Sequence, residues 1–224
     1  MTKHAQLPLW DDKSPDQKID TLHDMMLDMY RYGLLDSYSE IIETLENHQP
    51  ADDKEKADVE QIIRLIDEHP NIINKNCEIG HITGSALIVD VAQKRVLLHF
   101  HRKLNRWLQL GGHAEYEKYP HQIAEREAKE ESGLIDLKLF PDTNKPTLID
   151  VDVHTIPQQK NRPEHLHLDF RYAFSTNTPE LVNGAEGESD QFLWIPLSDL
   201  ENHRDMLSEE LMRYMVKIRT YLSH

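Results

Sequence analysis

The first third of the chain carries apolar residues at helical spacing. Ser14-Pro15 is a helix-start signal, because a capping residue precedes a proline at the first helical position. The apolar positions that follow it are Ile19, Leu22, Met25, Met26 and Met29. Gly33 fits the end of this helix. Two further helices are predicted over residues 37–47 and 53–69. Their apolar positions are Ile41, Ile42, Leu45, Val59, Ile62, Ile63 and Ile66.

Apolar stripes of this size must be buried, because an exposed stripe favours association. They can pack on the rest of the chain or on a second copy of it in a homodimer, and the pattern does not distinguish the two. Residues 1–77 hold no catalytic constellation of their own. We therefore interpret residues 1–77 as an N-terminal helical extension.

From Ile79 onward the pattern changes to short β-branched segments that are typical of strands. The expected strands are 85–89, 95–100, 107–110, 148–153, 165–174 and 192–195. A final helix is expected over residues 208–222, with Leu211, Met215, Ile218 and Leu222 facing inward. Strands interrupted by helices indicate an α/β or α+β domain over residues 78–224.

Composition and charge narrow the range of functions that this chain can have. The chain has 224 residues and a formal net charge of −15, so nucleic acid, whose phosphates attract Lys and Arg, is not an expected partner. Cys77 is the only cysteine, which excludes an internal disulfide and a multi-cysteine zinc site. The sequence shows no signal peptide and no membrane span, so a cytoplasmic protein without a membrane partner is expected.

The segment between Pro120 and Gly133 carries the most informative pattern. Proline fits the start of a helix, and glycine fits the left-handed position that ends one. At about 100° per residue, one side of this helix holds Ile123, Glu127, Glu130, Glu131 and Leu134. Glu125 and Lys129 fall on the far side, four residues apart, as a solvent-facing ion pair.

Three carboxylates that share the inward side of a helix repel one another and lose hydration. A divalent cation bound by these carboxylates would offset both their repulsion and their loss of hydration. Oxygen ligands with no accompanying cysteine suit Mg²⁺ or Mn²⁺. The alternative is an ordinary charged helix face in contact with solvent.

The stretch from Gly112 to Leu134 resembles the Nudix box. In that box a glycine is followed after five residues by a glutamate, and after seven more by Arg-Glu-aliphatic-any-Glu-Glu-any-Gly-aliphatic. This chain supplies Arg126, Glu127, Ala128, Glu130, Glu131, Gly133 and Leu134 in register. Lys118 stands where the first glutamate is expected, and Glu115 and Glu117 are near enough to compensate. The resemblance implies an α/β/α sandwich with a mixed sheet, preceded here by the helical segment.

The resemblance also implies a magnesium-dependent hydrolase, with Mn²⁺ as the other candidate ion. It would cleave a phosphoanhydride bond in a nucleoside diphosphate derivative by metal-activated water. Glu130 and Glu131 would bind the metal together with the backbone carbonyl of Gly111. Glu127 would be a further ligand or the base that activates water, and Arg126 would orient the glutamates.

A late acidic loop supplies one more candidate ligand. Many members of the family add an acid before the penultimate strand or helix, and residues 186–190 occupy such a loop ahead of Trp194. Glu188 is the candidate in this loop. A solvated acidic loop without a ligand would have the same sequence.

Two groups of residues bear on the substrate, which is expected to be a small phosphorylated nucleotide-like molecule. A basic patch precedes the box, and residues 165–171 alternate so that their polar side chains share one face. The candidate substrate-binding residues are His101, Arg102, Arg106, His113, His165 and His167. The histidines, with His154, could line a pocket or hold a transition metal, and a solvent-facing strand would show the same alternation. The basic patch also fits an ordinary turn.

Two other functions are open at the level of sequence. A catalytically weak Nudix-fold module that binds a nucleotide or a protein is consistent with Lys118, whereas the intact Arg-Glu-x-x-Glu-Glu core favours an enzyme. Isomerase chemistry occurs on the same fold with a catalytic cysteine, but Cys77 precedes the first strand of the sheet. The sequence does not identify the leaving group, because a fold does not decide among substrates.

Overall fold

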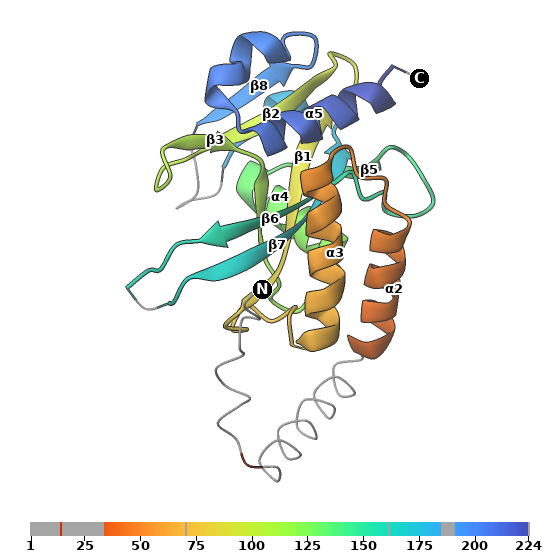
Figure 1. Cartoon of the computed structure of the whole chain (residues 1–224). Coiled ribbons are helices and arrows are strands. Elements are labelled where there is room, and N and C mark those ends of the chain that lie inside the picture. The colour runs from red at the N-terminus through yellow and green to blue at the C-terminus, as the bar shows by residue number, and fades with distance from the viewer. Residues whose placement is uncertain (1–13, 15–33, 70, 161, 185–190, 224) are drawn as a thin grey trace.

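The computed structural model describes residue 14 and residues 34–69, 71–160, 162–184 and 191–223. An eight-stranded mixed sheet lies at its centre with helices on both faces, as expected from the sequence (Figure 1). The strands are β1 (Gly80–Asp90), β2 (Arg95–His101), β3 (Arg106–Leu108), β4 (Leu110–His113), β5 (Lys138–Phe140), β6 (Asp150–Ile156), β7 (His165–Ser175) and β8 (Phe192–Pro196). The helices are α2 (Leu34–Glu46), α3 (Asp53–Glu68), α4 (Pro120–Ser132) and α5 (Glu209–Tyr221), with 3₁₀ helices η1 (Pro179–Leu181) and η2 (Leu200–Met206).

Strand β1 organises the sheet. It pairs in parallel with β7 and antiparallel with β2 and β4, while β5 and β6 pair with β7 and β3 and β8 pair with β2. Successive side chains of a strand point to opposite faces, so β1 contributes to two cores. Ile82 and Ile88 belong to the core shared with α2, α3 and α4. Leu87 and Val89 belong to the core shared with α5.

Helices α2 and α3 bury the apolar stripes that the sequence predicted. Buried residues of α2 and α3 join the core that also holds the sheet and α4, among them Ile41, Leu45, Val59, Ile62 and Ile66. Of the two alternatives for these stripes, the structure therefore shows packing on the rest of the chain. The first expected helix, which would end at Gly33, lies outside the described residues apart from Ser14. The boundary between residues 77 and 78 stays a prediction.

Helix α3 covers the edge of the sheet at β6. Glu55 accepts a hydrogen bond from the backbone N–H of Val151 at 3.1 Å, and Asp58 accepts one from Val153 at the same distance. Alternate N–H groups of an edge strand are the groups that a neighbouring strand would otherwise bond. The two carboxylates therefore take the place of a further strand.

A buried ion-pair network joins α3 to α5. The Glu55 carboxylate is fully buried and accepts hydrogen bonds from Lys217 at 2.5 Å and from His48 at 2.7 Å. Arg213, which also lies on α5, donates a hydrogen bond to Asp150 at 2.8 Å. Burial alone would raise the pKa of the Glu55 carboxyl, but the hydrogen bonds from His48 and Lys217 outweigh it and hold that pKa far below its ordinary value.

We expect Glu55→Gln to lower the free energy of unfolding by about 3 kcal/mol at pH 7, because it leaves buried cations without their partner. A depressed folded-state pKa contributes stability above the unfolded value of 4.5, and this contribution is lost as the pH falls below it. The difference between wild type and variant should therefore shrink below pH 4.5. Urea unfolding at pH 7 and pH 4 measures it. Glu60→Gln, on the exposed side of the same helix, is the control, and equal effects of the two substitutions would contradict the network's role.

Most expected strands and the final helix are confirmed, with two corrections. The prediction of a single strand over residues 107–110 is wrong, because β3 pairs with β2 and β4 pairs with β1, and Gln109 lies between them. Strand β5 was not predicted. It has only three residues and begins at the exposed Lys138, so its pattern is too short to indicate a strand.

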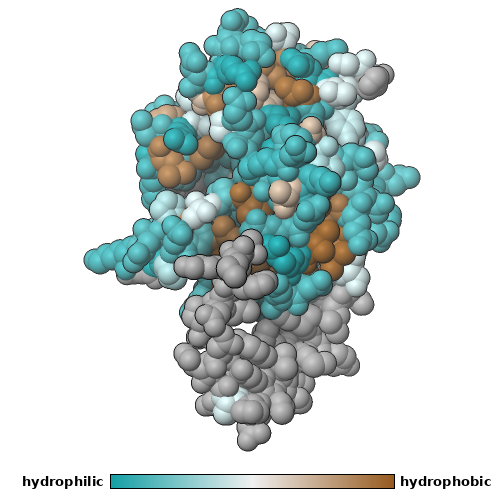
Figure 2. Space-filling model, in the orientation of Figure 1, coloured by the Kyte–Doolittle hydropathy of each residue, from teal (hydrophilic) through white to brown (hydrophobic). Residues whose placement is uncertain are grey.

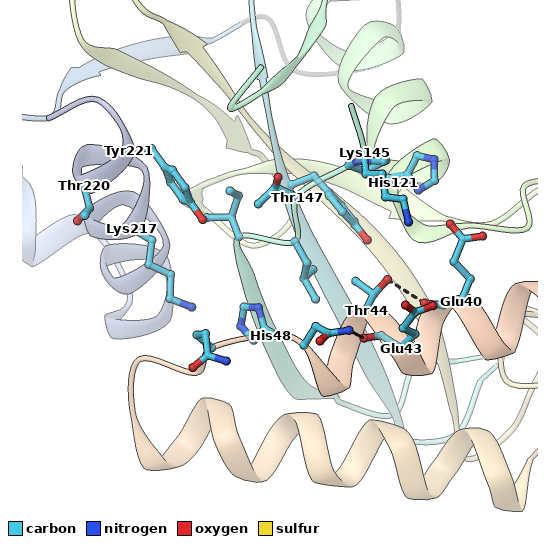
Figure 3. A pocket seen from close by; sticks show the side chains of 16 residues that line it. Glu40, Glu43, Thr44, His48, His121, Lys145, Thr147, Lys217, Thr220 and Tyr221 are labelled. Carbon is cyan, nitrogen blue, oxygen red and sulfur yellow. Dashed lines mark hydrogen bonds between the residues drawn. The ribbon is translucent and has the colours of Figure 1, made fainter. Parts of the chain in front are cut away.

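The surface offers further places for ligands. The face in Figure 2 is mostly hydrophilic, with apolar side chains in separate patches. A cavity of about 520 Å³ lies between α2 and α5, and its lining mixes acidic and basic side chains such as Glu40, His121 and Lys217 (Figure 3). Within the described part of the chain, no helix combines the length and the apolar character that crossing a membrane requires.

Candidate active site

Helix α4 begins and ends where the sequence predicts. Pro120 occupies its first turn, and Gly133 ends it with a left-handed φ of 71°. The buried Ile123 faces β1 at Gly84, where an added Cβ atom would collide with the carbonyl oxygen of Pro120. The absence of a side chain at Gly84 thus lets the helix lie close to the sheet.

The three glutamates of the box differ in exposure. The side chains of Glu131 and Glu127 are 11% and 17% exposed, whereas that of Glu130 is 57% exposed. Glu131 accepts a hydrogen bond from the backbone N–H of Gly111 at 2.8 Å. The carboxylate of Glu127 lies against Gly112, where an added Cβ atom would collide with it. Two glycines in β4 therefore bring the backbone next to two carboxylates.

Arg126 connects the glutamates. Its guanidinium lies 2.8 Å from Glu130, 3.0 Å from Glu127 and 2.5 Å from Glu117, and it donates to the backbone carbonyl of His113 at 2.7 Å. Glu117 therefore supplies a carboxylate next to the position where the Nudix box expects one. The departure of the chain from the box at residue 118 leaves Arg126 with three carboxylate partners.

Opposing effects act on the pKa of Glu127. Burial raises the pKa of the Glu127 carboxyl, and the neighbouring Glu130 and Glu115 raise it further, although Arg126 acts against them. A divalent cation beside Glu127 would favour its charged form. The oxygen donors present, two carboxylates with little solvent contact and the backbone of β4, fit a hard cation such as Mg²⁺.

The opposite side of α4 behaves as predicted. Lys129 donates to Glu125 at 2.6 Å, and both side chains are 39% exposed.

The three carboxylates on the inward side of α4 lie less close together than the helical spacing suggests, because Arg126 holds Glu130 toward solvent. Among the described residues, the one group of three His, Cys, Asp or Glu side chains placed to share a metal ion is His81, His165 and His167, and not the glutamates of α4.

His99 lies beside the site; it belongs to the basic patch that precedes the box, but it was not among the six candidate substrate-binding residues. Its Nδ1 atom lies 3.9 Å from a carboxylate oxygen of Glu131. Burial, together with the neighbouring His101, lowers the pKa of His99 to about 4, so the ring is neutral near pH 7 and makes no ion pair with Glu131. The alternation of β2 could have indicated this position, because Leu97, His99 and His101 share the face that meets α4.

The six candidate substrate-binding residues fall into two groups. His101, Arg102 and Arg106 belong to the hairpin of β2 and β3, where both arginines are exposed and His101 accepts from the backbone N–H of Leu104 at 3.2 Å. The remaining three are His113, His165 and His167 on β4 and β7.

The histidines of β4 and β7 lie on the other face of the sheet. His113 is paired with Thr83, and His167 is paired with His81. The alternate position Gly84 faces α4, so the side chains of the odd-numbered neighbours point away from that helix. The structure therefore separates these histidines from the hairpin group. Glu188, the late-loop candidate, lies outside the described residues.

The chain is similar to known proteins in sequence and in structure. The family model for the NUDIX domain matches residues 81–215. A NUDIX-family hydrolase from Clostridium perfringens is 31% identical, with a TM-score of 0.47, and the match covers 62% of this chain and 97% of that chain. A C. elegans Ap4A hydrolase is 20% identical (TM-score 0.47; 63% and 97% covered), and E. coli dihydroneopterin triphosphate pyrophosphohydrolase is 16% identical (TM-score 0.44; 63% and 94% covered). No curated protein gave a match.

The family model spans more than half of the chain, and so the chain belongs to the NUDIX family. This confirms the resemblance drawn from the box. The protein is therefore a hydrolase of the Nudix type, and this family generally uses divalent metals.

Proposed function

We propose that this protein hydrolyses a phosphoanhydride bond in a nucleoside diphosphate derivative, with Mg²⁺ as its cation and Mn²⁺ as a substitute. The observation that carries the proposal is the placement of Glu127 and Glu131. Both carboxylates have little solvent contact and lie against the backbone of Gly111 and Gly112. Carboxylates withdrawn from solvent in this way suit a hard divalent cation.

Each residue of the site has a distinct task in this reaction. Glu130, Glu131 and the carbonyl oxygen of Gly111 would hold the cation. When bound, the cation would neutralise the charge of the phosphate oxygens and lower the pKa of bound water. Glu127 would accept the proton of the attacking water, because its carboxylate lies beside the proposed ligands, against Gly112. Arg126 would keep the carboxylates in place through its ion pairs.

The substrate phosphates would bind at the hairpin of β2 and β3. Arg102 and Arg106 are exposed there, in a chain whose net charge is −15. A guanidinium group can donate two parallel hydrogen bonds to the oxygens of one phosphate. Its positive charge also attracts an anionic substrate to a protein whose net negative charge would otherwise repel it. His101 lies on the same hairpin and would assist them. The histidines on the far face of the sheet are not part of this proposal.

We expect hydrolysis to require a divalent cation. A hydrolysis screen against nucleoside triphosphates, ADP-ribose, dinucleotides and coenzyme A, with and without Mg²⁺ and with the products separated by chromatography, would identify the substrate. Activity on that substrate should fall to background in excess chelator and return when Mg²⁺ is added in excess. A protein whose turnover is unchanged in chelator does not act by this mechanism. Binding of substrate without turnover under every metal condition would favour the nucleotide-binding module instead.

A further inference from the structure

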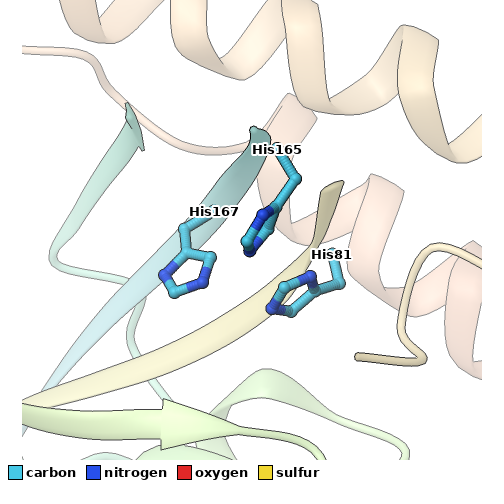
Figure 4. Close-up of side chains that lie close together, drawn as sticks. All are labelled: His81, His165 and His167. Carbon is cyan, nitrogen blue, oxygen red and sulfur yellow. The ribbon is translucent and has the colours of Figure 1, made fainter. Parts of the chain in front are cut away.

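Histidine side chains gather on the face of the sheet opposite α4. His81 lies on β1, His165 and His167 lie on β7, and Figure 4 shows the three rings close together. One nitrogen of each ring lies within 4.8 Å of the other two. The ring of His113, from β4, has its centre 4.9 Å from that of His81 and 5.0 Å from that of His167. Strand register creates this cluster, because His81 pairs with His167 in the parallel ladder.

Burial disfavours the charged form of His81, His113 and His167. Burial, followed by neighbouring charges, lowers the pKa of His81 to about 3 and that of His167 to about 2, and burial also lowers the pKa of His113. Each neutral imidazole keeps one nitrogen lone pair. The Nε2 atom of His81 is buried and has no hydrogen-bond partner among the described residues. A buried polar atom without a partner is costly. If the ring proton moves to Nδ1, a metal ion bound to Nε2 would remove this cost.

The remaining contacts leave ligand atoms facing one another. The Nδ1 atom of His165 donates to the carbonyl oxygen of Pro163 at 2.9 Å, because a carbonyl only accepts, and in the neutral form of such a ring the lone pair is on Nε2. The Nε2 atoms of His113 and His167 are 3.3 Å apart and share a hydrogen bond, so one of them carries a proton that metal binding would move to the other nitrogen of its ring. Two nitrogens of a tetrahedral zinc site, each bonded at about 2.0–2.1 Å, lie roughly 3.3 Å apart.

We propose that His81, His165 and His167 form a transition-metal site of the Zn²⁺ class, with His113 as the fourth ligand. Imidazole nitrogen suits Zn²⁺, Ni²⁺ or Cu²⁺, whereas the glutamates of α4 suit Mg²⁺. Binding would shorten the separations between ligand nitrogens by up to about 1.5 Å, from as much as 4.8 Å to the roughly 3.3 Å of a tetrahedral site. The site does not depend on the hydrolase reaction, since it lies on the other face of the sheet.

Metal binding at this site requires Arg162 to move away from His81. Its guanidinium lies 3.0 Å from Nδ1 of His81. Because a guanidinium only donates, Nδ1 accepts and the ring proton is on Nε2. Coordination through Nε2 requires this proton to shift to Nδ1 and Arg162 to leave its position. Removal of the guanidinium should therefore strengthen metal binding.

The test is calorimetric titration of the full chain with Zn²⁺ in excess Mg²⁺, which occupies the carboxylate site. Wild type should bind one equivalent, His81→Asn and His167→Asn should each weaken binding by about tenfold or more, and Arg162→Ala should strengthen it. His154→Asn is the matched control, since His154 is bonded to Asp152 at 2.9 Å and is outside the ligand set. Loss of binding in this control, or weaker binding in Arg162→Ala, would contradict the assignment.

Spectroscopy on the wild-type chain gives a second measurement that needs no variant to fold. Co²⁺ bound by nitrogen ligands in tetrahedral geometry gives intense visible absorption, whereas Co²⁺ bound by carboxylates and water in octahedral geometry absorbs weakly. Intense bands that disappear on addition of one equivalent of Zn²⁺ are the expected result. A weak spectrum together with Zn²⁺ binding that is insensitive to His81→Asn and His167→Asn would overturn the proposal.

Discussion

Glu130→Gln and Glu131→Gln are each expected to lower kcat by about 100-fold or more, the usual scale for a group that acts in the transition state. Each substitution keeps the shape of the side chain and removes the charge that would hold the cation. In Glu131→Gln the amide retains an oxygen for the N–H of Gly111, so the fold around β4 should persist. Steady-state kinetics with saturating Mg²⁺, on the substrate found in the hydrolysis screen, measure the effect.

Glu125→Gln is the matched control for these variants. It lies on the same helix and loses only a half-exposed ion pair with Lys129, an interaction of less than about 1 kcal/mol. Its kcat should stay near that of wild type. Equal losses in all three variants would mean that the inward side of α4 has no special role. Unfolding curves of the three proteins separate loss of chemistry from loss of folding.

The ends and the two sides of α4 could be predicted from the sequence because they depend on local rules. Pro120 and Gly133 act through their own backbone preferences, and Glu125 and Lys129 meet because helical geometry puts them one turn apart. The same holds for the stripes of α2 and α3, whose buried positions follow the helical period. Local patterns of this kind need no knowledge of the rest of the fold.

Other contacts could not be predicted, because they join residues far apart in sequence. Glu55 bonds Lys217, which is 162 residues away, and nothing in either segment indicates the other. His81 joins His165 and His167 only through the parallel register of β1 and β7. Glu117 was one of two residues offered as compensation for Lys118, and only the position of the loop before α4 selects it as the partner of Arg126.

A chain that begins at Cys77 is expected to be insoluble or aggregated at concentrations at which the full chain is soluble. It lacks α2 and α3, so the apolar face of the sheet that they cover becomes exposed. The N–H groups of Val151 and Val153 lose their carboxylate partners, and this strand edge becomes free to pair with another chain. Size-exclusion chromatography with light scattering, together with circular dichroism, measures the change.

A single substitution tests the same packing without shortening the chain. Ile62 is fully buried in α3, and Ile62→Ala should lower the free energy of unfolding by about 2–5 kcal/mol because it leaves a cavity in the shared core. Arg64→Ala, at an exposed position of the same helix, should change it by less than about 0.5 kcal/mol. A shortened chain that stays monomeric and soluble and unfolds cooperatively, with Ile62→Ala as mild as Arg64→Ala, would show that the sheet and α4 fold independently of the N-terminal helices.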